Sequence, residues 1–206
     1  MQPEALTDVA KRVTLDQVIG HVSGALPHLS TGDRARLRRG PLKDGDVGAP
    51  AFWKLAAHEK YGFKGDDKWA AILQAMAILT PRPADGDDNP KGPHDPSHKF
   101  GMALCDGGDK SWGQGSADPR PVLSELRLAK MLAAKGELRR ELVIRAAKII
   151  AKSGPSVNCA DIARFILNEN IDEYARQIAK HYYIRLSRAA NGGNADDDKP
   201  IAETQE

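Results

Sequence analysis

The stretch RPVLSELRLAKMLAAKGELRRELVIRAAKIIAK, which runs from Arg120 to Lys152, predicts two consecutive amphipathic helices broken once at Gly136. Nine basic residues against three acids give it a net charge of +6, whereas the whole protein carries only +2. Positive charge is therefore gathered here and cancelled elsewhere. The second helix is expected to bury an apolar side opposite its cations, formed by Leu138, Leu142, Ala146 and Ile149.

The composition favours an all-α fold. Aromatic residues are scarce at 5%, charged residues reach 28%, and a chain of 206 residues has room for one or two domains with a real core. The sequence has no apolar run long enough for a membrane span, and its first residues do not resemble a signal peptide. Cys105 and Cys159 lie far apart without a CxxC motif, which is typical of inert thiols in a reducing compartment. We therefore expect a cytoplasmic helical bundle protein with about eight or nine helices.

Helical spacing and capping residues extend this pattern along the chain. Apolar residues recur every three or four positions over residues 15–26, and Pro27 ends that helix. The helix ending at Leu79 carries large apolar residues on all sides, so it is expected in the core. A last helix spans about residues 171–190. The candidate N-caps are Thr14, Ser30 or Thr31, Asp66 or Asp67, and Asn158.

Residues 80–98 read TPRPADGDDNPKGPHDPSH, a composition that predicts a long, acidic, mobile loop. This loop is expected to divide the chain into an N-terminal part, residues 1–98, which ends in the loop itself, and a C-terminal part, residues 99–190. The remaining residues, 191–206, are polar and acidic and are expected to form a disordered tail.

No pattern in the chain predicts catalysis, a cofactor or a metal. The sequence has no phosphate-binding loop, nucleophile elbow or paired-carboxylate helix motif. His94 and His98 are close in sequence, but the intervening prolines disfavour the helix that would place both on one face. The loop acids Asp85, Asp87 and Asp88 do not have the spacing of an EF-hand, so they are interpreted as solvated.

Basic clusters remain as the candidate functional feature. A solvated face is the simpler interpretation of any single basic helix, because lysine and arginine stems cover apolar surface. Three clusters in one small protein favour ligand binding instead, and the first is rich in arginine, which suits bidentate contact with phosphate. It lies in LSTGDRARLRRG, residues 29–40, and the other two lie in the helices on either side of Gly136.

LSTGDRARLRRG resembles the Gly-x-Arg-Ala-x-Leu-Arg-Arg signature of the CasB family, the small subunit of type I-E CRISPR Cascade complexes. Later segments resemble that family in the same order, over most of residues 15–188. They are FGMALC from Phe100, SELRLAKMLAAKGELRREL from Ser124, DIARFILN from Asp161 and AKHYYIRL from Ala179.

This resemblance implies an all-helical protein with an N-terminal bundle and a smaller C-terminal bundle. It also implies a non-catalytic subunit, present in two copies beside other Cascade subunits and the crRNA, whose basic surface contacts the displaced non-target strand of target DNA and stabilises the R-loop. Carried over by motif position, the DNA-binding residues are Arg34, Arg36, Arg38, Arg39 and Arg127. Charge alone extends the set to Lys130, Arg139, Arg140, Arg145 and Lys148.

Two other hypotheses stay open at this point. The basic faces could instead pair with acidic surfaces of partner subunits, which would make the protein a scaffold that acts only through protein contacts. A stand-alone helical regulator is disfavoured, because the sequence has no recognition-helix pattern with a clear dimer element. If the DNA-binding hypothesis is right, the basic regions near residues 34–39 and 127–148 are expected to lie along one surface.

Overall fold

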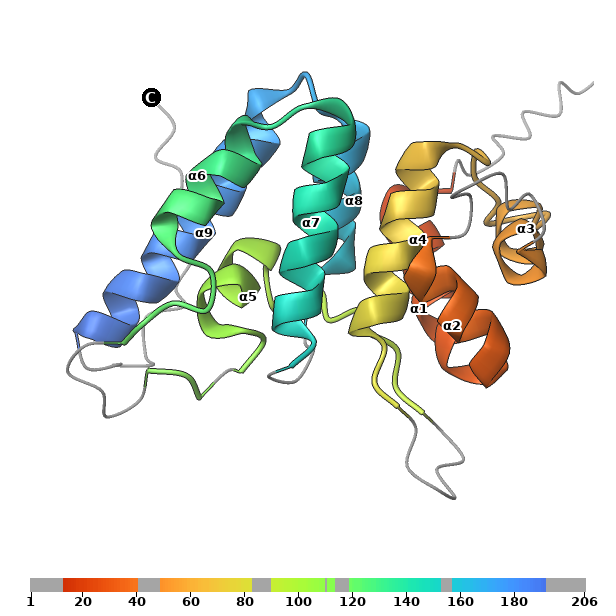
Figure 1. Ribbon diagram of the computed structural model, residues 1–206, viewed down its shortest axis with the longest axis horizontal. Coiled ribbons are helices and arrows are strands. Elements are labelled where there is room, and N and C mark those ends of the chain that lie inside the picture. The colour runs from red at the N-terminus through yellow and green to blue at the C-terminus, as the bar shows by residue number, and fades with distance from the viewer. Residues whose placement is uncertain are drawn as a thin grey trace, which may run out of the picture.

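The computed structural model describes residues 13–40, 49–82, 90–109, 111–113, 119–152 and 157–191. Over these residues the chain forms nine α-helices and one 3-10 turn, with no strand, which confirms the expected all-α fold and helix number. In chain order they are α1 (Leu15–Ala25), η1 (Leu26–His28), α2 (Thr31–Arg39), α3 (Pro50–Ala56), α4 (Asp67–Leu79), α5 (Phe100–Asp106), α6 (Glu125–Ala133), α7 (Gly136–Ile150), α8 (Cys159–Leu167) and α9 (Asp172–Ala190). Figure 1 shows α1 to α4 at one end of the molecule, α5, α6 and α9 at the other, and α7 and α8 between them.

Side-chain caps start several helices where the sequence predicts them. Thr14 and Gln17 form a reciprocal capping box, in which each side chain accepts a hydrogen bond from the backbone N–H of the other residue. The side chains of Ser30, Asp66 and Asn158 likewise accept backbone N–H groups at the starts of α2, α4 and α8. These contacts satisfy amides that have no partner inside the helix, which is why polar residues mark the boundaries.

Helix α4 is the centre of the core. Nine of its thirteen residues are buried, and Ile72, Leu73 and Met76 are fully enclosed. It packs against α2 on one side and against α7 and α8 on another. The expectation that this helix belongs in the core is confirmed, and the reason is that a helix apolar all round must be covered on every side.

The second half of the expected mobile loop is an ordered part of the fold. The N–H of His94 donates to the hydroxyl of Ser23 on α1, and its Nδ1 accepts the N–H of Cys159 at the start of α8. The N–H of Asn158 donates to the carbonyl of His98, which is itself buried. Residues 90–98 therefore link α1 to α8, and the expectation of a mobile segment is wrong for them.

The physical reason for this difference is that backbone groups of the segment find partners outside it. Gly92 lies so close to α1 that an added Cβ would stand 2.2 Å from the carbonyl oxygen of Ser23, so only glycine allows this approach. Composition shows that a segment is poor in apolar side chains, but it does not show which distant backbone groups it will meet. Residues 83–89 lie outside the described residues.

A buried polar network holds this segment to the C-terminal helices. The Nε2 atom of His98 lies 3.0 Å from a carboxylate oxygen of Asp106, in α5. Arg185, in α9, donates from Nε to the other oxygen of Asp106 over 2.8 Å, and the N–H of Gly108 donates to the first oxygen. Because all these groups are buried or nearly so, each needs its partners.

The core residues form one cluster that runs through both halves of the chain. The division between residues 98 and 99 stays a prediction. The expected tail lies outside the described residues apart from Asn191.

Glu169 joins the two halves at the turn between α8 and α9. Its carboxylate accepts a hydrogen bond from the N–H of Gly136, the first residue of α7, and forms an ion pair of 2.7 Å with Lys68 on α4. Its backbone carbonyl accepts a hydrogen bond from the ammonium group of Lys135. One residue therefore fixes the start of α7 against α4, next to the groove described below.

The contacts of Glu169 predict a pH-dependent stability. The hydrogen bond from Lys68 and then that from Gly136 lower the pKa of its carboxyl below the ordinary value of 4.5. Folding thus favours the ionised form, so its stabilisation is complete above that ordinary pKa and is lost as pH falls through the lowered pKa of the folded state. Between about pH 5 and pH 3, the free energy of unfolding of Glu169→Gln is expected to fall less steeply than that of the unchanged protein, as measured by urea titration.

The matched control is Glu173→Gln, which removes a carboxylate whose ion pair with Arg176 is exposed and lies within one turn of α9. This variant is expected to keep the pH slope of the unchanged protein, because exposed pairs contribute little. Equal slopes for the Glu169 variant and the unchanged protein would contradict the role given to Glu169.

Candidate nucleic-acid interface

The four arginines of α2 lie in different surroundings. Arg38 donates from Nε to the carbonyl of Ala77 and from Nη2 to that of Thr80, over 2.9 and 3.0 Å, and so caps the C-terminal end of α4. Burial, followed by the nearby charges of Arg34 and Arg82, lowers the pKa of Arg38. The Nε–H group and one N–H group of Nη2 are therefore already engaged in hydrogen bonds within the protein.

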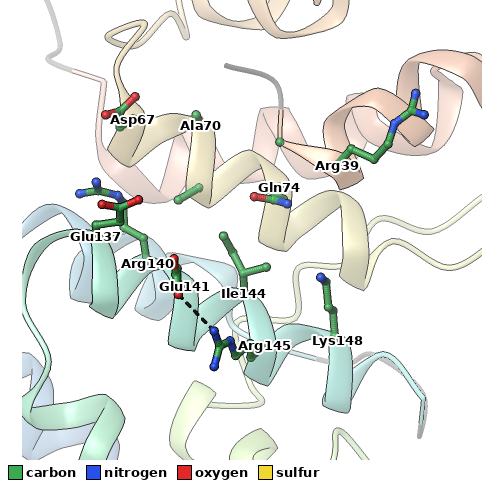
Figure 2. Close-up of a pocket in the computed structure, with 12 residues that line it drawn as sticks. Arg39, Asp67, Ala70, Gln74, Glu137, Arg140, Glu141, Ile144, Arg145 and Lys148 are labelled. Carbon is green, nitrogen blue, oxygen red and sulfur yellow. Dashed lines mark hydrogen bonds and ion pairs between the residues drawn. The ribbon is translucent and has the colours of Figure 1, made fainter. Parts of the chain in front are cut away.

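The other α2 arginines differ from one another in exposure. The Nη1 atom of Arg34 is buried and has no hydrogen-bond partner among the described residues, whereas the side chains of Arg36 and Arg39 are exposed. Figure 2 shows the guanidinium of Arg39 directed along α2 and away from α7. The α2 cluster thus combines Arg38, which caps α4, with the partly buried Arg34 and the exposed Arg36 and Arg39.

Arg139 is part of the core. It is only 3% exposed, and it donates to the carbonyls of Ala134 and Phe165 over 2.7 and 3.0 Å. Its guanidinium also lies 4.2 Å from the centre of the Phe165 ring. Arg139 therefore caps α6 and ties it to the last turn of α8, in a position that a nucleic-acid strand does not reach.

A first hollow, the α4/α7 groove, separates the N-terminal helices from α7 and has a volume of about 510 Å³. Basic and acidic side chains alternate along it, and Arg145 forms an ion pair of 3.2 Å with Glu141. Figure 2 shows the lining residues of α4 on one side of this groove and those of α7 on the other. Its lining residues are Arg39, Gly40, Asp67, Ala70, Ala71, Gln74, Glu137, Arg140, Glu141, Ile144, Arg145 and Lys148.

A second hollow, the α6/α7 groove, lies on the other side of α7 and has a volume of about 330 Å³. Within the part of the chain that the structure describes, its charged lining residues are Arg127, Lys130 and Arg145, with no acid among them. The rest of the lining is aliphatic or thioether: Leu123, Met131, Leu142, Ala146 and Ile149. This groove is therefore uniformly positive at its rim and apolar at its floor.

Arg145 lines both grooves, so the two hollows adjoin across α7. Six of the ten cations considered in the sequence border them, contributed by α2, α6 and α7. They are Arg39, Arg127, Lys130, Arg140, Arg145 and Lys148. The structure thus brings the two basic regions of the sequence together at these residues, while Arg38 and Arg139 are held by backbone carbonyls.

The apolar side of α7 differs from the expected one. The buried residues of α7 are Val143, Ala146, Ala147 and Ile150 together with Arg139, whereas Leu138 is 47% exposed. Leu142 and Ile149 are half-buried because they line the α6/α7 groove. The reason is that α7 packs against α4, α5, α6 and α8, so it has no single buried side. Sequence periodicity therefore placed Leu142, Ala146 and Ile149 correctly on one side of α7, but it did not show that this side lines a groove.

The described residues also bear on three other features: metal sites, membrane-spanning helices and reactive thiols. They contain no group of three or more histidine, cysteine or acidic side chains placed to hold a metal ion. Over the same ranges, no helix is both long and apolar enough to cross a membrane. Both cysteines are buried, and burial raises the pKa of Cys105 to about 12 and raises that of Cys159 as well, so both thiols stay protonated.

The geometry of Arg38 predicts that its removal will affect stability. Arg38→Ala leaves two C-terminal carbonyls of α4 without their charged donor, so the free energy of unfolding is expected to fall by about 2 kcal/mol. Urea denaturation measures this change. Arg39→Ala is the matched control one position along α2, with an expected change within about 0.5 kcal/mol because its side chain is exposed. A loss as large for the Arg39 variant as for the Arg38 variant would contradict the capping role.

Comparison with known proteins gives one match. A protein-family model described as CRISPR-associated protein Cse2 matches residues 33–183. The matched range covers most of the described chain, including α4, α6 and α7, which border the two grooves. No curated protein and no solved structure was found to match the chain.

Proposed function

Since the chain belongs to the Cse2 family of CRISPR-associated proteins, we propose that it binds DNA along the two grooves beside α7. Membership of this family makes the protein a subunit of a Cascade complex. The family match confirms the resemblance to CasB, the small subunit of type I-E complexes. In this proposal the protein is not an enzyme, and it acts in the cytoplasm. The subunit would contact the displaced non-target strand of target DNA and stabilise the R-loop, beside the crRNA, the other subunits and a second copy of itself.

The observation that supports this proposal most directly is the position of Arg145. It lines both grooves, and around it the cations of α6 and α7 follow one another across the surface. Exposed cations along a surface contact phosphates without reading the bases, and this is what holding an unpaired strand requires.

The energetics of R-loop formation make a small number of such contacts sufficient. The heteroduplex that forms is about as stable as the DNA duplex that it replaces, so the exchange is nearly balanced. Contacts to the displaced strand shift this balance and oppose reannealing. Lys130 and Arg145 suit that task because both are exposed and neither has to be removed from a buried network to meet a phosphate.

The alternative is a scaffold whose basic faces contact partner subunits rather than DNA. One observation bears on it: Leu126, in α6, is 82% exposed, and apolar surface left uncovered in the folded chain can be buried against a partner subunit. This alternative predicts that neutralising the grooves weakens assembly and leaves the affinity of the isolated chain for DNA unchanged.

The two hypotheses are separated by the variant Arg127→Ala/Lys130→Ala/Arg145→Ala. Removing three phosphate contacts is expected to weaken binding of the full chain to single-stranded DNA and to reduce the slope of log K against log salt by about 2. Binding is measured by fluorescence anisotropy over a range of salt concentrations. Assembly of the same variant with the other Cascade subunits is measured by size-exclusion chromatography.

The matched control removes three exposed lysines beside α3: Lys54→Ala/Lys60→Ala/Lys64→Ala. These lysines make the same change in net charge at the end of the molecule opposite α6 (Figure 1), so they should leave the salt slope nearly unchanged. Unchanged DNA binding by the groove variant, with impaired assembly, would overturn the DNA-binding proposal in favour of the scaffold.

A further inference from the structure

The α6/α7 groove has two chemical features that a bare phosphate backbone does not use together. Its rim carries three cations and no acid, but its floor is made of Leu123, Met131, Leu142, Ala146 and Ile149. A phosphate uses the rim alone. Nucleobases stack best on aromatic rings, and none of the described residues that line this groove is aromatic. A peptide segment with acids beside an aliphatic side chain would use both the rim and the floor.

The C-terminal part of this chain has that composition. Residues 192–206 contain five acids and one lysine, a net charge of −4, whereas residues 1–191 carry +6. Three of the acids are consecutive, Asp196, Asp197 and Asp198, and the aliphatic Ile201 follows three positions later. Negative charge is absent from the described residues that line this groove, and it is concentrated in residues 192–206 of the same chain.

Helix α9 brings the chain close to the groove before this segment begins. The hydroxyl of Tyr182 donates to the carbonyl of Leu123, a residue of the groove, over 2.6 Å. The hydroxyl of Tyr183 donates to Glu125 at the start of α6. Asn191 lies nine residues after Tyr182, which is about 14 Å along a helix. A chain of fifteen residues can span up to about 50 Å, so the segment is long enough to return to the groove.

We propose that residues 192–206 dock in the α6/α7 groove of the same chain. The aspartates at 196–198 would face Lys130, Arg127 and Arg145, and Ile201 would cover the aliphatic floor. The segment then competes with DNA for the same cations. This competition rests on the proposed function, whereas the docking itself does not.

Docking is tested without DNA by a nitroxide label at Thr204→Cys in the full chain. The buried native thiols, with their raised pKa values, leave the new cysteine as the reactive one. The label is expected to broaden the methyl NMR signals of Met131, Leu142 and Ile149, and to leave those of Leu55 in α3 sharp, because paramagnetic broadening falls steeply with distance.

Charge reversal shows whether the rim holds the segment. Lys130→Glu/Arg145→Glu in the labelled chain is expected to abolish the broadening at the groove, because both side chains are exposed and the segment is acidic. About 1 M salt should do the same in the unreversed chain, since the screening length falls to about 3 Å. Groove signals no broader than those of Leu55, or broadening that survives both treatments, would overturn the docking proposal.

Competition is tested with Asp196→Asn/Asp197→Asn/Asp198→Asn in the full chain. If the segment occupies the groove for about 70–90% of the time, its release raises the apparent affinity for single-stranded DNA about three- to tenfold at low salt. The matched control, Asp85→Asn/Asp87→Asn/Asp88→Asn, makes the same change in charge in the other acidic segment. An equal gain in both variants would mean a general charge effect and would overturn the competition.

The two proposals fail in different ways. Broadening of the groove signals without any DNA binding would support the docking proposal and contradict the proposed function. Salt-sensitive DNA binding that depends on Lys130 and Arg145, with no broadening, would keep the function and remove the docked segment.

Discussion

The rest of the structure depends on the enclosure of α4. Nine of its thirteen residues are buried, so the helix needs neighbours on nearly every side. Helices α2, α7 and α8 supply them, although they come from distant parts of the sequence. Their apolar residues are used in this enclosure, and most of their cations are left outside it, with Arg38 and Arg139 as exceptions. The basic surface around α7 is therefore a consequence of how α4 is covered, because the cations of α7 other than Arg139 lie outside the same core.

The arginines of the chain serve two purposes that charge alone does not separate. Arg38 and Arg139 each donate to two backbone carbonyls at the ends of helices, where the planar fork of the guanidinium satisfies acceptors that have no partner inside the helix. Arg145 and Lys130 are exposed beside an apolar floor. The same segment of sequence thus stabilises the C-terminal helices and carries the candidate interface, with neighbouring residues in different roles.

The junction between the halves of the chain is polar as well as apolar. Glu169 holds α7 to α4, and the Asp106 network holds residues 90–98 to α5 and α9. Polar contacts of this kind constrain geometry more narrowly than apolar packing, because a buried or half-buried charge loses its stabilisation when its partner shifts. Glu169 therefore fixes the start of α7 against α4 at one end of the α4/α7 groove.

The sequence by itself determined the all-α fold, the helix starts at Thr14 and Asn158, the core position of α4 and the family. These features depend on local capping chemistry, on apolar periodicity and on short motifs, all of which can be read from neighbouring residues. Only the tertiary structure decided which cations are free to bind. Arg139 and Arg140 are adjacent in one helix, yet a rotation of about 100° between them sends the first into the core and the second into a groove. Whether a cation of α7 is buried or exposed depends on which helices pack against α7, and neighbouring residues in the sequence do not show which helices these are.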